Sequence, residues 1–406
     1  MPDFEARPCS VCGADVAEEV YRQRLLPAFD FPGFDQRVQI CMACGFVYVS
    51  PAPSSALLSR YYSTLSNYEN PQNLGRPTDE DRRKYDRARG IMLGARDGLP
   101  PGRALDIGCA VPYQLSRLKA EGWSVVGTDP SPLVAKLGRE LYDVEVRTGL
   151  FAPEMFTDEP RFDLVTLSHV LEHLVAPLES LRDIRRLMSP RGTLYIEVPN
   201  LLEPAVPFGY FTFEHLNYFT PTTLTSLLSV AGFAPVTTET FSNDDGTSPF
   251  YPVIAATFRP SAEMPTVQSD HAAARGAVAE YRSSAAREEE RIRALVASVV
   301  ESVPPGRLAL WGAGIHTNQL LTLTGMDVSR VGCVFDNDPK KQGRLLLDRP
   351  VRGLPADPSE VKRDIDAIII SSRASEDAIY RQISHLRDAG VRVYRLYANG
   401  PDLESV

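Results

Sequence analysis

Long hydrophobic runs are absent from this sequence of 406 residues. No apolar stretch approaches the roughly 20 residues that a membrane-spanning helix requires. The N-terminus, MPDFEARPCS, also lacks the basic region and the following apolar region of a signal peptide. These absences predict a cytoplasmic protein without a membrane partner.

A basic surface is missing as well. Lysine and arginine number 43 against 52 aspartate and glutamate residues, and the net charge is −9. Proteins that bind nucleic acid neutralise phosphates with clustered lysine and arginine side chains. The composition therefore predicts a small-molecule substrate and no nucleic acid, and it leaves the oligomeric state open.

Cysteine is scarce outside the first 44 residues. Four of the six cysteines form two Cys-x-x-Cys-Gly turns that begin at Cys9 and Cys41. In a reducing compartment, two matched turns indicate a metal site and disfavour disulfides. Four thiolates close a tetrahedral zinc shell, which predicts a structural zinc ion. The expected ligands are Cys9, Cys12, Cys41 and Cys44.

Strand-like runs alternate with helical stretches from residue 103 onward and again after residue 306. This alternation predicts an α/β fold with two doubly wound, Rossmann-like domains. Residues 266–303 contain no proline and predict a connecting helix. The expected segments are a loop-rich zinc-binding module (1–50), a helical lid or collar (51–95), a first Rossmann-like domain (96–262), the connecting helix (263–305) and a second Rossmann-like domain (306–406).

The first Rossmann-like domain lacks glycines at its nucleotide-binding turn. In LDIGCAVPYQL, Asp106 and Gly108 keep the expected pattern, but Ala110 and Pro112 occupy the next two glycine positions. A pyrophosphate needs the close backbone approach that glycine allows, whereas S-adenosylmethionine (SAM) carries no phosphate. Asp129, after the second strand, supplies an acid for the ribose of SAM, although it also suits NAD. The turn favours SAM, with Pro112 as the first helical residue and Ala110 as a modest obstruction.

Two later segments resemble class I SAM-dependent methyltransferases. SHVLEHL follows the run FDLVTL, and RGTLYIEVPN matches the fifth-strand region of that class. The cofactor-binding residues that the resemblance implies are Asp106, Gly108 and Ala110 at the methionine end, Asp129 at the ribose, Gly149 and Leu150 near the adenine, and Ser168 and His169 at the sulfonium. The simpler alternatives are local hydrogen bonds for His169 and His173 and a helix-capping role for Asp129.

The segment GYFTFEHLNYFTP, residues 209–221, is the densest polar and aromatic cluster. With the cysteine turns and the C-terminal WGAGIHTNQLL, it resembles nucleotide-sugar C-methyltransferases of antibiotic deoxysugar pathways over nearly the whole chain. In that family a His/Glu pair removes a proton beside a ketone, and the enolate attacks the methyl group of SAM. The resemblance implies His215 as the base, Glu214 as its partner, Tyr210 or Tyr218 as a donor to the enolate, and a nucleotide-linked keto-sugar as substrate.

Alternatives remain open for the function. His215 would equally deprotonate a hydroxyl in an O-methyltransferase, and Thr212 departs from the family, which has tyrosine there. The altered turn suggests a protein that binds SAM without turnover. An NAD-dependent oxidoreductase would use the WGAG turn of the second domain.

The second Rossmann-like domain has its own incomplete glycine turn. GAGIHT lacks the third glycine of a dinucleotide site. Contact with a nucleotide-sugar through His316 and Asn318 is one expectation, and a purely structural domain is the other.

Overall fold

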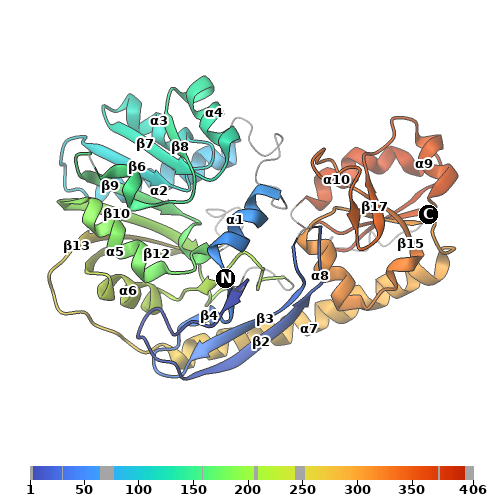
Figure 1. The fold of residues 1–406 in the computed structure, drawn as a ribbon, viewed down its shortest axis with the longest axis horizontal. Coiled ribbons are helices and arrows are strands. Elements are labelled where there is room, and N and C mark those ends of the chain that lie inside the picture. The colour runs from blue at the N-terminus through green and yellow to red at the C-terminus, as the bar shows by residue number, and fades with distance from the viewer. Residues whose placement is uncertain are drawn as a thin grey trace. The chain divides into compact units, whose positions relative to one another are not determined.

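The computed structural model describes residues 3–29, 31–64, 77–157, 159–204, 209–242, 252–373 and 375–397 (Figure 1). The chain divides into two compact units. Described residues among 3–22, 37–63 and 77–282 belong to the first unit, and 23–36 with 283–397 make up most of the second. No helix among the described residues is long and apolar enough to cross a membrane.

A seven-stranded sheet forms the centre of the first unit, as the sequence predicts. Five neighbouring strands are parallel, and β12 and β13 add an antiparallel edge. In spatial order the strands are β12 (Phe233–Phe241), β13 (Val253–Pro260), β10 (Met188–Pro199), β9 (Phe162–Ser168), β6 (Arg103–Ile107), β7 (Ser124–Asp129) and β8 (Glu145–Thr148).

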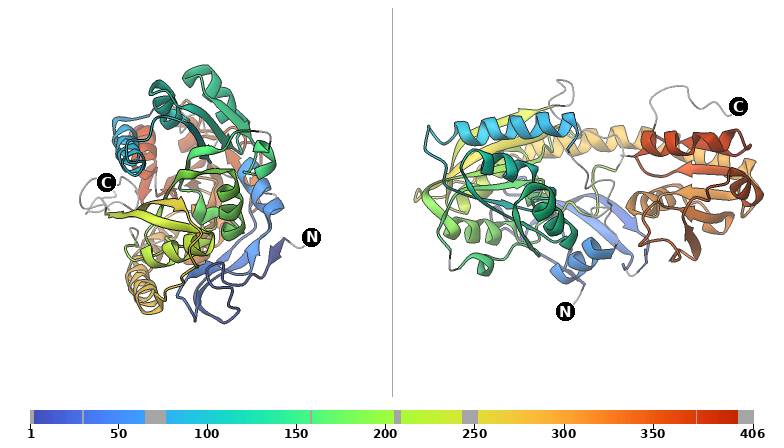
Figure 2. Two further views of the ribbon diagram at one scale, coloured as in Figure 1. Left: turned by 90° about the vertical axis from the view of Figure 1, so that its left-hand side faces the viewer. Right: turned by 90° about the horizontal axis from the view of Figure 1, so that it is seen from above.

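Helices cover both faces of this sheet (Figures 1 and 2). Because alternate residues of a strand face opposite sides, Leu164 packs into one core and Val165 into the other. The first core takes its helical residues from α2 (Asp79–Gly94), α3 (Tyr113–Ala120) and α4 (Pro132–Tyr142), and the second from α5 (Pro177–Leu187) and α6 (Pro221–Val230). Burial on both faces explains the near-continuous apolar runs of the strands.

The parallel strands reverse their order between β6 and β9. From β6 the chain proceeds to β7 and β8 on one side, and then to β9 and β10 on the other. Sheets of this type bind ligands outside the carboxyl ends of the strands at this switch point. A ligand site is therefore expected among the residues at the carboxyl ends of β6, β7, β9 and β10.

The N-terminal segment contains more regular structure than the sequence predicts. The loop-rich interpretation of residues 1–50 is wrong, because a four-stranded sheet in the order β11-β4-β3-β2 includes two long strands. The polar alternation in AEEVYRQRL marks a strand with one buried side. The elements are β1 (Phe4–Glu5), β2 (Ala17–Leu25), β3 (Phe34–Cys41), β4 (Val47–Val49), β5 (Ala52–Pro53), α1 (Ser55–Thr64) and β11 (Asn217–Tyr218).

The second unit has a six-stranded sheet with the order β16-β17-β15-β14-β18-β19. Its strands are parallel except for the β16–β17 pair. The strands are β14 (Leu308–Trp311), β15 (Val331–Phe335), β16 (Leu345–Leu346), β17 (Arg349–Arg352), β18 (Ala367–Ile370) and β19 (Arg392–Arg395), and the helices are α8 (Ile315–Thr324), α9 (Pro358–Asp364) and α10 (Glu376–Ile383). A second α/β domain is thus confirmed.

The long proline-free segment forms one helix, α7 (His271–Ser302), close to the expected range (Figure 1). It ends just before Pro304, which cannot continue a helix because it has no backbone N–H.

Candidate active site and metal centre

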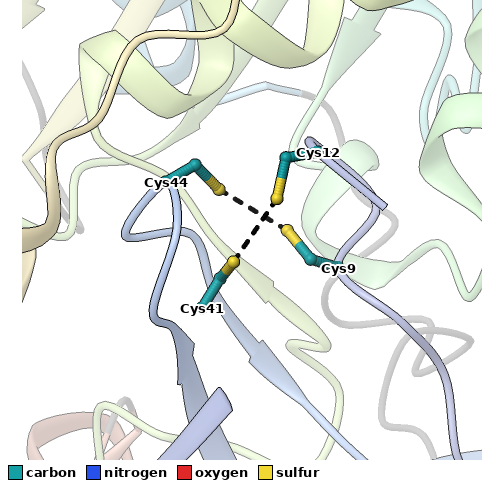
Figure 3. A group of neighbouring side chains, drawn as sticks. All are labelled: Cys9, Cys12, Cys41 and Cys44. Carbon is teal, nitrogen blue, oxygen red and sulfur yellow. Dashed lines mark hydrogen bonds between the residues drawn. The ribbon is translucent and has the colours of Figure 1, made fainter. Parts of the chain in front are cut away.

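The four N-terminal cysteines come together in the first unit (Figure 3). The Sγ atoms of Cys9 and Cys44 lie 3.5 Å apart, and those of Cys12 and Cys41 lie 3.4 Å apart. These separations are far longer than a disulfide bond of about 2.05 Å, and all four thiols are free. Four converging sulfur atoms fit the tetrahedral shell of a structural zinc ion.

A glycine after the second cysteine turn fixes its position in the first unit. Gly45 has a φ of +81°, and a Cβ atom there would lie 2.4 Å from the backbone nitrogen of His271. The amide of Asp270 donates a hydrogen bond of 3.0 Å to the carbonyl oxygen of Cys44. The turn therefore packs directly on the start of α7, and no residue with a side chain fits at this glycine.

The altered glycine turn between β6 and α3 keeps a glycine-type backbone. Gly108 has a φ of +66°, and a Cβ atom there would lie 2.6 Å from Val170 Cγ2. Ala110 also has a positive φ, +47°, and its amide donates 3.0 Å to Asp129 Oδ2. Ala110 thus has a backbone conformation that favours glycine. This conformation is unfavourable for a residue with a Cβ atom, so the effect of the alanine goes beyond the space that its methyl group occupies.

The helix after this turn begins at Tyr113, one position later than the sequence predicts. Pro112 is the N-cap residue of α3, with φ −79° and ψ 45°. Since proline lacks an N–H, either position is tolerated. Gly122, with a φ of +93°, follows the C-cap residue Glu121 at the other end of α3.

Asp129 lies at the carboxyl end of β7 and organises the turns on both sides of it. Its Oδ2 atom accepts from Ala110, and its Oδ1 atom accepts 2.9 Å from the amide of Ser131. The capping alternative for Asp129 is wrong, because Ser131 is the N-cap residue of α4. Gly149, whose amide donates to the carbonyl oxygen of Asp129, begins the segment after β8, and Leu150 follows it as an exposed side chain.

Asp106, in β6, is a buried acid beside Asp129. Thr166 Oγ1 donates a hydrogen bond of 2.6 Å to Asp106 Oδ1. Burial, assisted by the charge of Asp129 and opposed by the Thr166 hydrogen bond, raises the pKa of Asp106 to about 7. A cation bound near this carboxyl group would favour its ionised form.

His169 follows Ser168 at the end of β9 and lies between two buried carboxylates. Its Nδ1 atom is 3.3 Å from Glu172 Oε1, and its Nε2 atom is 3.4 Å from Glu197 Oε1. Although burial and Lys84 oppose it, these carboxylates raise the pKa of His169 above its usual value. The ring therefore does more than cap a helix, because it bridges the buried carboxylates of Glu172 and Glu197.

Glu197 connects this network to α2. Its carboxylate accepts from Tyr195 at 2.7 Å and from Arg87 at 2.8 Å, and Lys84 lies 3.6 Å away. Against the effect of burial, His169 and the two cations hold the pKa of Glu197 well below its usual range. Glu197 is not among the site residues expected from the sequence, although a carboxylate within the apolar run LYIEVP signals a paired buried charge.

Three side chains from two segments converge near the end of β9. One side-chain atom each of Glu172, His173 and His215 lie within 4.8 Å of one another. Burial first, and His173 second, lower the pKa of His215 to about 3. The imidazole of His215 is therefore neutral near pH 7 and has a free lone pair.

Glu214 does not provide the carboxylate that faces His215. Its Oε1 atom accepts a hydrogen bond from the hydroxyl of Tyr61 in α1, and its carbonyl oxygen lies 2.9 Å from His173 Nδ1. The carboxylate grouped with His215 is that of Glu172. The expected His/Glu pair is thus a different pair in the structure, because neighbouring residues 214 and 215 direct their side chains to different partners.

Tyr210 and Tyr218 belong to an aromatic cluster in the core. Their rings lie 5.8 Å apart and pack with Phe211 and with Tyr281 of α7. The Tyr218 hydroxyl lies 3.4 Å from the carbonyl oxygen of Thr212. The two rings therefore pack the segment that carries His215, and the predicted hydrogen bond from one of their hydroxyls to an enolate stays a prediction.

Two polar residues, Asn217 and Arg7, hold the segments around Glu172 and His215 together. Asn217 Nδ2 donates to the carbonyl oxygens of Leu171 and Leu174, at 3.1 and 2.7 Å. The guanidinium of Arg7 donates to Asn217 Oδ1 at 2.9 Å and to the carbonyl oxygen of Val175 at 2.8 Å. The cysteine turns, the 3-10 helix at Leu171–His173 and the segment of His215 are thereby fixed to one another.

Asn318 of the second unit is already engaged within that unit. Its Oδ1 atom accepts 2.7 Å from the amide of Leu26, and its Nδ2 group donates to the carbonyl oxygen of the same residue. The expectation that this amide contacts a substrate does not agree with this pairing.

A family comparison matches the first sheet. Residues 79–238 match the model of a family described as a methyltransferase domain. This range contains the five parallel strands and both acids at their carboxyl ends. Over residues 79–238 the chain is therefore similar to the methyltransferase domains of this family.

Several curated relatives share this part of the chain. The ubiquinone biosynthesis O-methyltransferase of Xanthomonas campestris pv. campestris (strain B100) is 27% identical over 135 residues, which are 32% of this chain and 56% of the relative. The tRNA U34 carboxymethyltransferase of Saccharophagus degradans is 31% identical over 147 residues, covering 32% and 44%. The chain thus spans about half the length of the curated relatives it matches.

Solved structures with a similar fold include the 1,6-didemethyltoxoflavin-N1-methyltransferase of Burkholderia thailandensis, with bound 1,6-didemethyltoxoflavin and S-adenosylhomocysteine. That structure has a TM-score of 0.41 and 20% identity, and covers 54% of this chain and 98% of its own.

Proposed function

We propose that this protein transfers the methyl group of SAM to a carbon atom of a small keto-sugar, linked to a nucleotide. The observation that carries the proposal is His215, an imidazole kept neutral beside the carboxyl edge of the methyltransferase sheet. A neutral imidazole can accept a proton. Methyl transfer to carbon requires such a base, because a C–H proton must be removed before the carbon can attack, whereas methyl transfer to an amine or oxygen atom requires no C–H proton to be removed.

The cofactor site of the proposal lies around the turn after β6. Asp106, whose pKa is raised to about 7, would pair with a cationic group of the cofactor. Asp129 would accept from the ribose, because its carboxylate lies at the carboxyl end of β7, beside the turn amides of Ala110 and Ser131. SAM supplies an activated methyl group on a sulfonium, so the methyl transfer itself requires no metal.

The protein's own residues would carry the proton. His215 removes it from the carbon beside the substrate ketone, and the carbon of the resulting enolate forms the new bond to the methyl group while S-adenosylhomocysteine leaves. Glu172 lies next to the imidazole and lowers the energy of its protonated form. Tyr61 and Tyr62 bring phenol hydroxyls to Glu214 and to His173, the latter at 3.2 Å.

The remaining assignments follow the same proposal. The four N-terminal thiolates would hold a structural zinc ion, which stays outside the chemistry because its shell is closed. Ser168 and Gly149 with Leu150 would border the sulfonium and the adenine, as expected from the sequence.

Proton exchange tests the proposal directly. The protein, incubated in D₂O with nucleoside diphosphate keto-sugars and S-adenosylhomocysteine, should replace the substrate proton beside the ketone by deuterium. With SAM instead, mass spectrometry and NMR should place the methyl group on that carbon. A methyl group on oxygen, with no exchange of carbon-bound protons, would overturn C-methylation.

O-methylation is the second candidate, favoured by the names of the ubiquinone O-methyltransferase relatives. In that reaction His215 would deprotonate a substrate hydroxyl, and the deuterium experiment separates the two candidates.

A further inference from the structure

We propose that Glu172, His173 and His215 form a binding site for a divalent transition-metal ion, separate from the four-cysteine site. A carboxylate oxygen and one ring nitrogen from each histidine lie within 4.8 Å of one another. Two imidazoles and a carboxylate are a typical ligand set for divalent ions of the first transition row, which bind imidazole nitrogen well. Mg²⁺, a hard ion, prefers oxygen ligands.

His173 is oriented as a metal ligand would be. Its Nδ1 atom lies 2.9 Å from the carbonyl oxygen of Glu214, which accepts a hydrogen bond only when Nδ1 carries the proton. The lone pair is then on Nε2, the atom 3.9 Å from Glu172 Oε1. A backbone carbonyl that fixes the tautomer of a histidine is the usual support for a ligating imidazole.

Glu172 is a buried carboxylate with capacity left for a cation. Its side chain is 1% exposed, and neither carboxylate oxygen accepts a hydrogen bond from the described residues. The nearest ring nitrogen is Nδ1 of His169, at 3.3 Å from Oε1. Burying an ionised carboxylate is costly unless charge or hydrogen bonds compensate it, and a divalent ion would complete that compensation.

The backbone on both sides of the ligands is fixed in advance. The amide of Leu216 donates 2.7 Å to the carbonyl oxygen of Glu172, and Asn217 Nδ2 lies 3.4 Å from the same oxygen. These bonds join the 3-10 helix that carries two ligands to the segment that carries the third. Because the ligands are held by a rigid frame, little ordering is needed when the ion binds.

Three protein ligands leave coordination positions open for water or for an oxygen of the substrate. The inference does not depend on the proposed function, because metal binding is measurable without turnover. The two are linked through His215, since a metal on its ring nitrogen occupies a lone pair that the base would use. Loaded protein should therefore exchange substrate protons more slowly.

Cobalt binding tests the proposal. The full-length protein, carrying one zinc per chain in the four-cysteine site, is titrated with Co²⁺ and followed by visible absorption and elemental analysis. We expect one further metal per chain with the weak d–d bands of nitrogen and oxygen ligands, and imidazole N–H resonances shifted by the paramagnetic ion in NMR. Glu172→Gln and His173→Asn should each weaken binding by at least about tenfold.

Glu214→Gln is the matched control, because its carboxylate bonds to Tyr61 and lies outside the ligand set. It should retain the cobalt affinity of the unmodified protein. The proposal is overturned if no second metal binds, if the only bands are thiolate-to-cobalt charge transfer, or if Glu172→Gln and His173→Asn bind cobalt normally. The shifted imidazole resonances are read on the unmodified protein, so an unfolded variant leaves the test decisive.

Discussion

The turns after β6 and β14 have the same backbone design in two different domains. In each, an aspartate beyond the next strand accepts from a turn amide: Ala110 donates 3.0 Å to Asp129, and Ala313 donates 2.7 Å to Asp336. Each aspartate also accepts from the amide two residues further on, at 2.9 and 2.8 Å. The strand-to-helix turns of the two Rossmann-like units therefore share one pattern of hydrogen bonds.

The side chains around the two turns differ completely. Asp106, two residues before the first turn glycine, pairs with Thr166 of β9, whereas Leu310 stands two residues before Gly312 and pairs with Ile369. The second aspartate has a buried lysine, Lys341, with Nζ at 3.6 Å, and the first has a second acid beside it. Two turns with the same backbone thus have different charged neighbours: a second acid beside Asp129, and a lysine beside Asp336. The proposed binding of a cationic cofactor therefore concerns the first turn alone, since function resides in the site rather than in the fold.

Removal of one zinc ligand should give the largest difference between the two units, which is a difference in thermal stability. Cys41→Ser breaks the four-thiolate shell, so the protein should lose its zinc, and the unfolding temperature of the first unit should fall by roughly 10 °C or more. The second unit should unfold as before, because its sheet uses none of these cysteines. Calorimetry with zinc analysis measures both, and Cys333→Ala, which keeps all four ligands, should retain one zinc per chain. Full zinc content in Cys41→Ser would contradict the assignment.

Replacement of the proposed base should have the next largest effect. His215→Asn should lower substrate proton exchange and methyl transfer by at least about 100-fold, because the imidazole that accepts the substrate proton is removed. SAM affinity, measured by calorimetry, should stay unchanged. His385→Asn, an exposed histidine of the second unit, serves as the control. Near-normal rates in His215→Asn would refute its role as the base.

The pH dependence of SAM binding tests the acid that only the first turn has. Asp106, with its pKa near 7, is mostly protonated at pH 6 and mostly ionised at pH 8. A cationic ligand binds the ionised form, so SAM binding must release a proton below pH 7, and its Kd should rise about tenfold from pH 8 to pH 6. Calorimetry at the two pH values measures this ratio. In Asp106→Asn the ratio of the two Kd values should fall to about one. A steep pH dependence in that variant would show that another group is responsible for it.

The smallest expected effect is on the free energy of unfolding, when the alanine of each turn is replaced by glycine. Ala110→Gly relieves a positive φ and should raise the free energy of unfolding by up to about 1 kcal/mol. Ala313 is buried and has no positive φ, so Ala313→Gly should lower that free energy by about 1 kcal/mol. Denaturant titrations of both variants measure the two signs, and equal signs would show that the turns are not strained differently.

The sequence predicts the parts of the site that local patterns determine. The cysteine spacing, the strand-helix alternation and the position of Asp129 after β7 all agree with the structure. The partners of each side chain depend on contacts between distant segments, and these were missed. Glu172 faces His215 across 43 positions of sequence, and Arg87 reaches Glu197 from α2. No periodicity encodes such contacts.

The packing of Tyr210 has the same origin. Its ring contacts Tyr281 of α7, and no pattern within the segment 209–221 encodes that contact. The predicted donor role of Tyr210 or Tyr218 stays a prediction. The positive φ of Ala110 is likewise invisible in the sequence, because the residue type argues against it.

Hydrogen exchange with and without S-adenosylhomocysteine tests the central claim, that the first turn binds the cofactor and the second does not. We predict slower amide exchange in the peptides that contain residues 105–113 and 168–174, with no change in those that contain residues 308–318. Protection of 308–318, or of neither turn, would contradict the account.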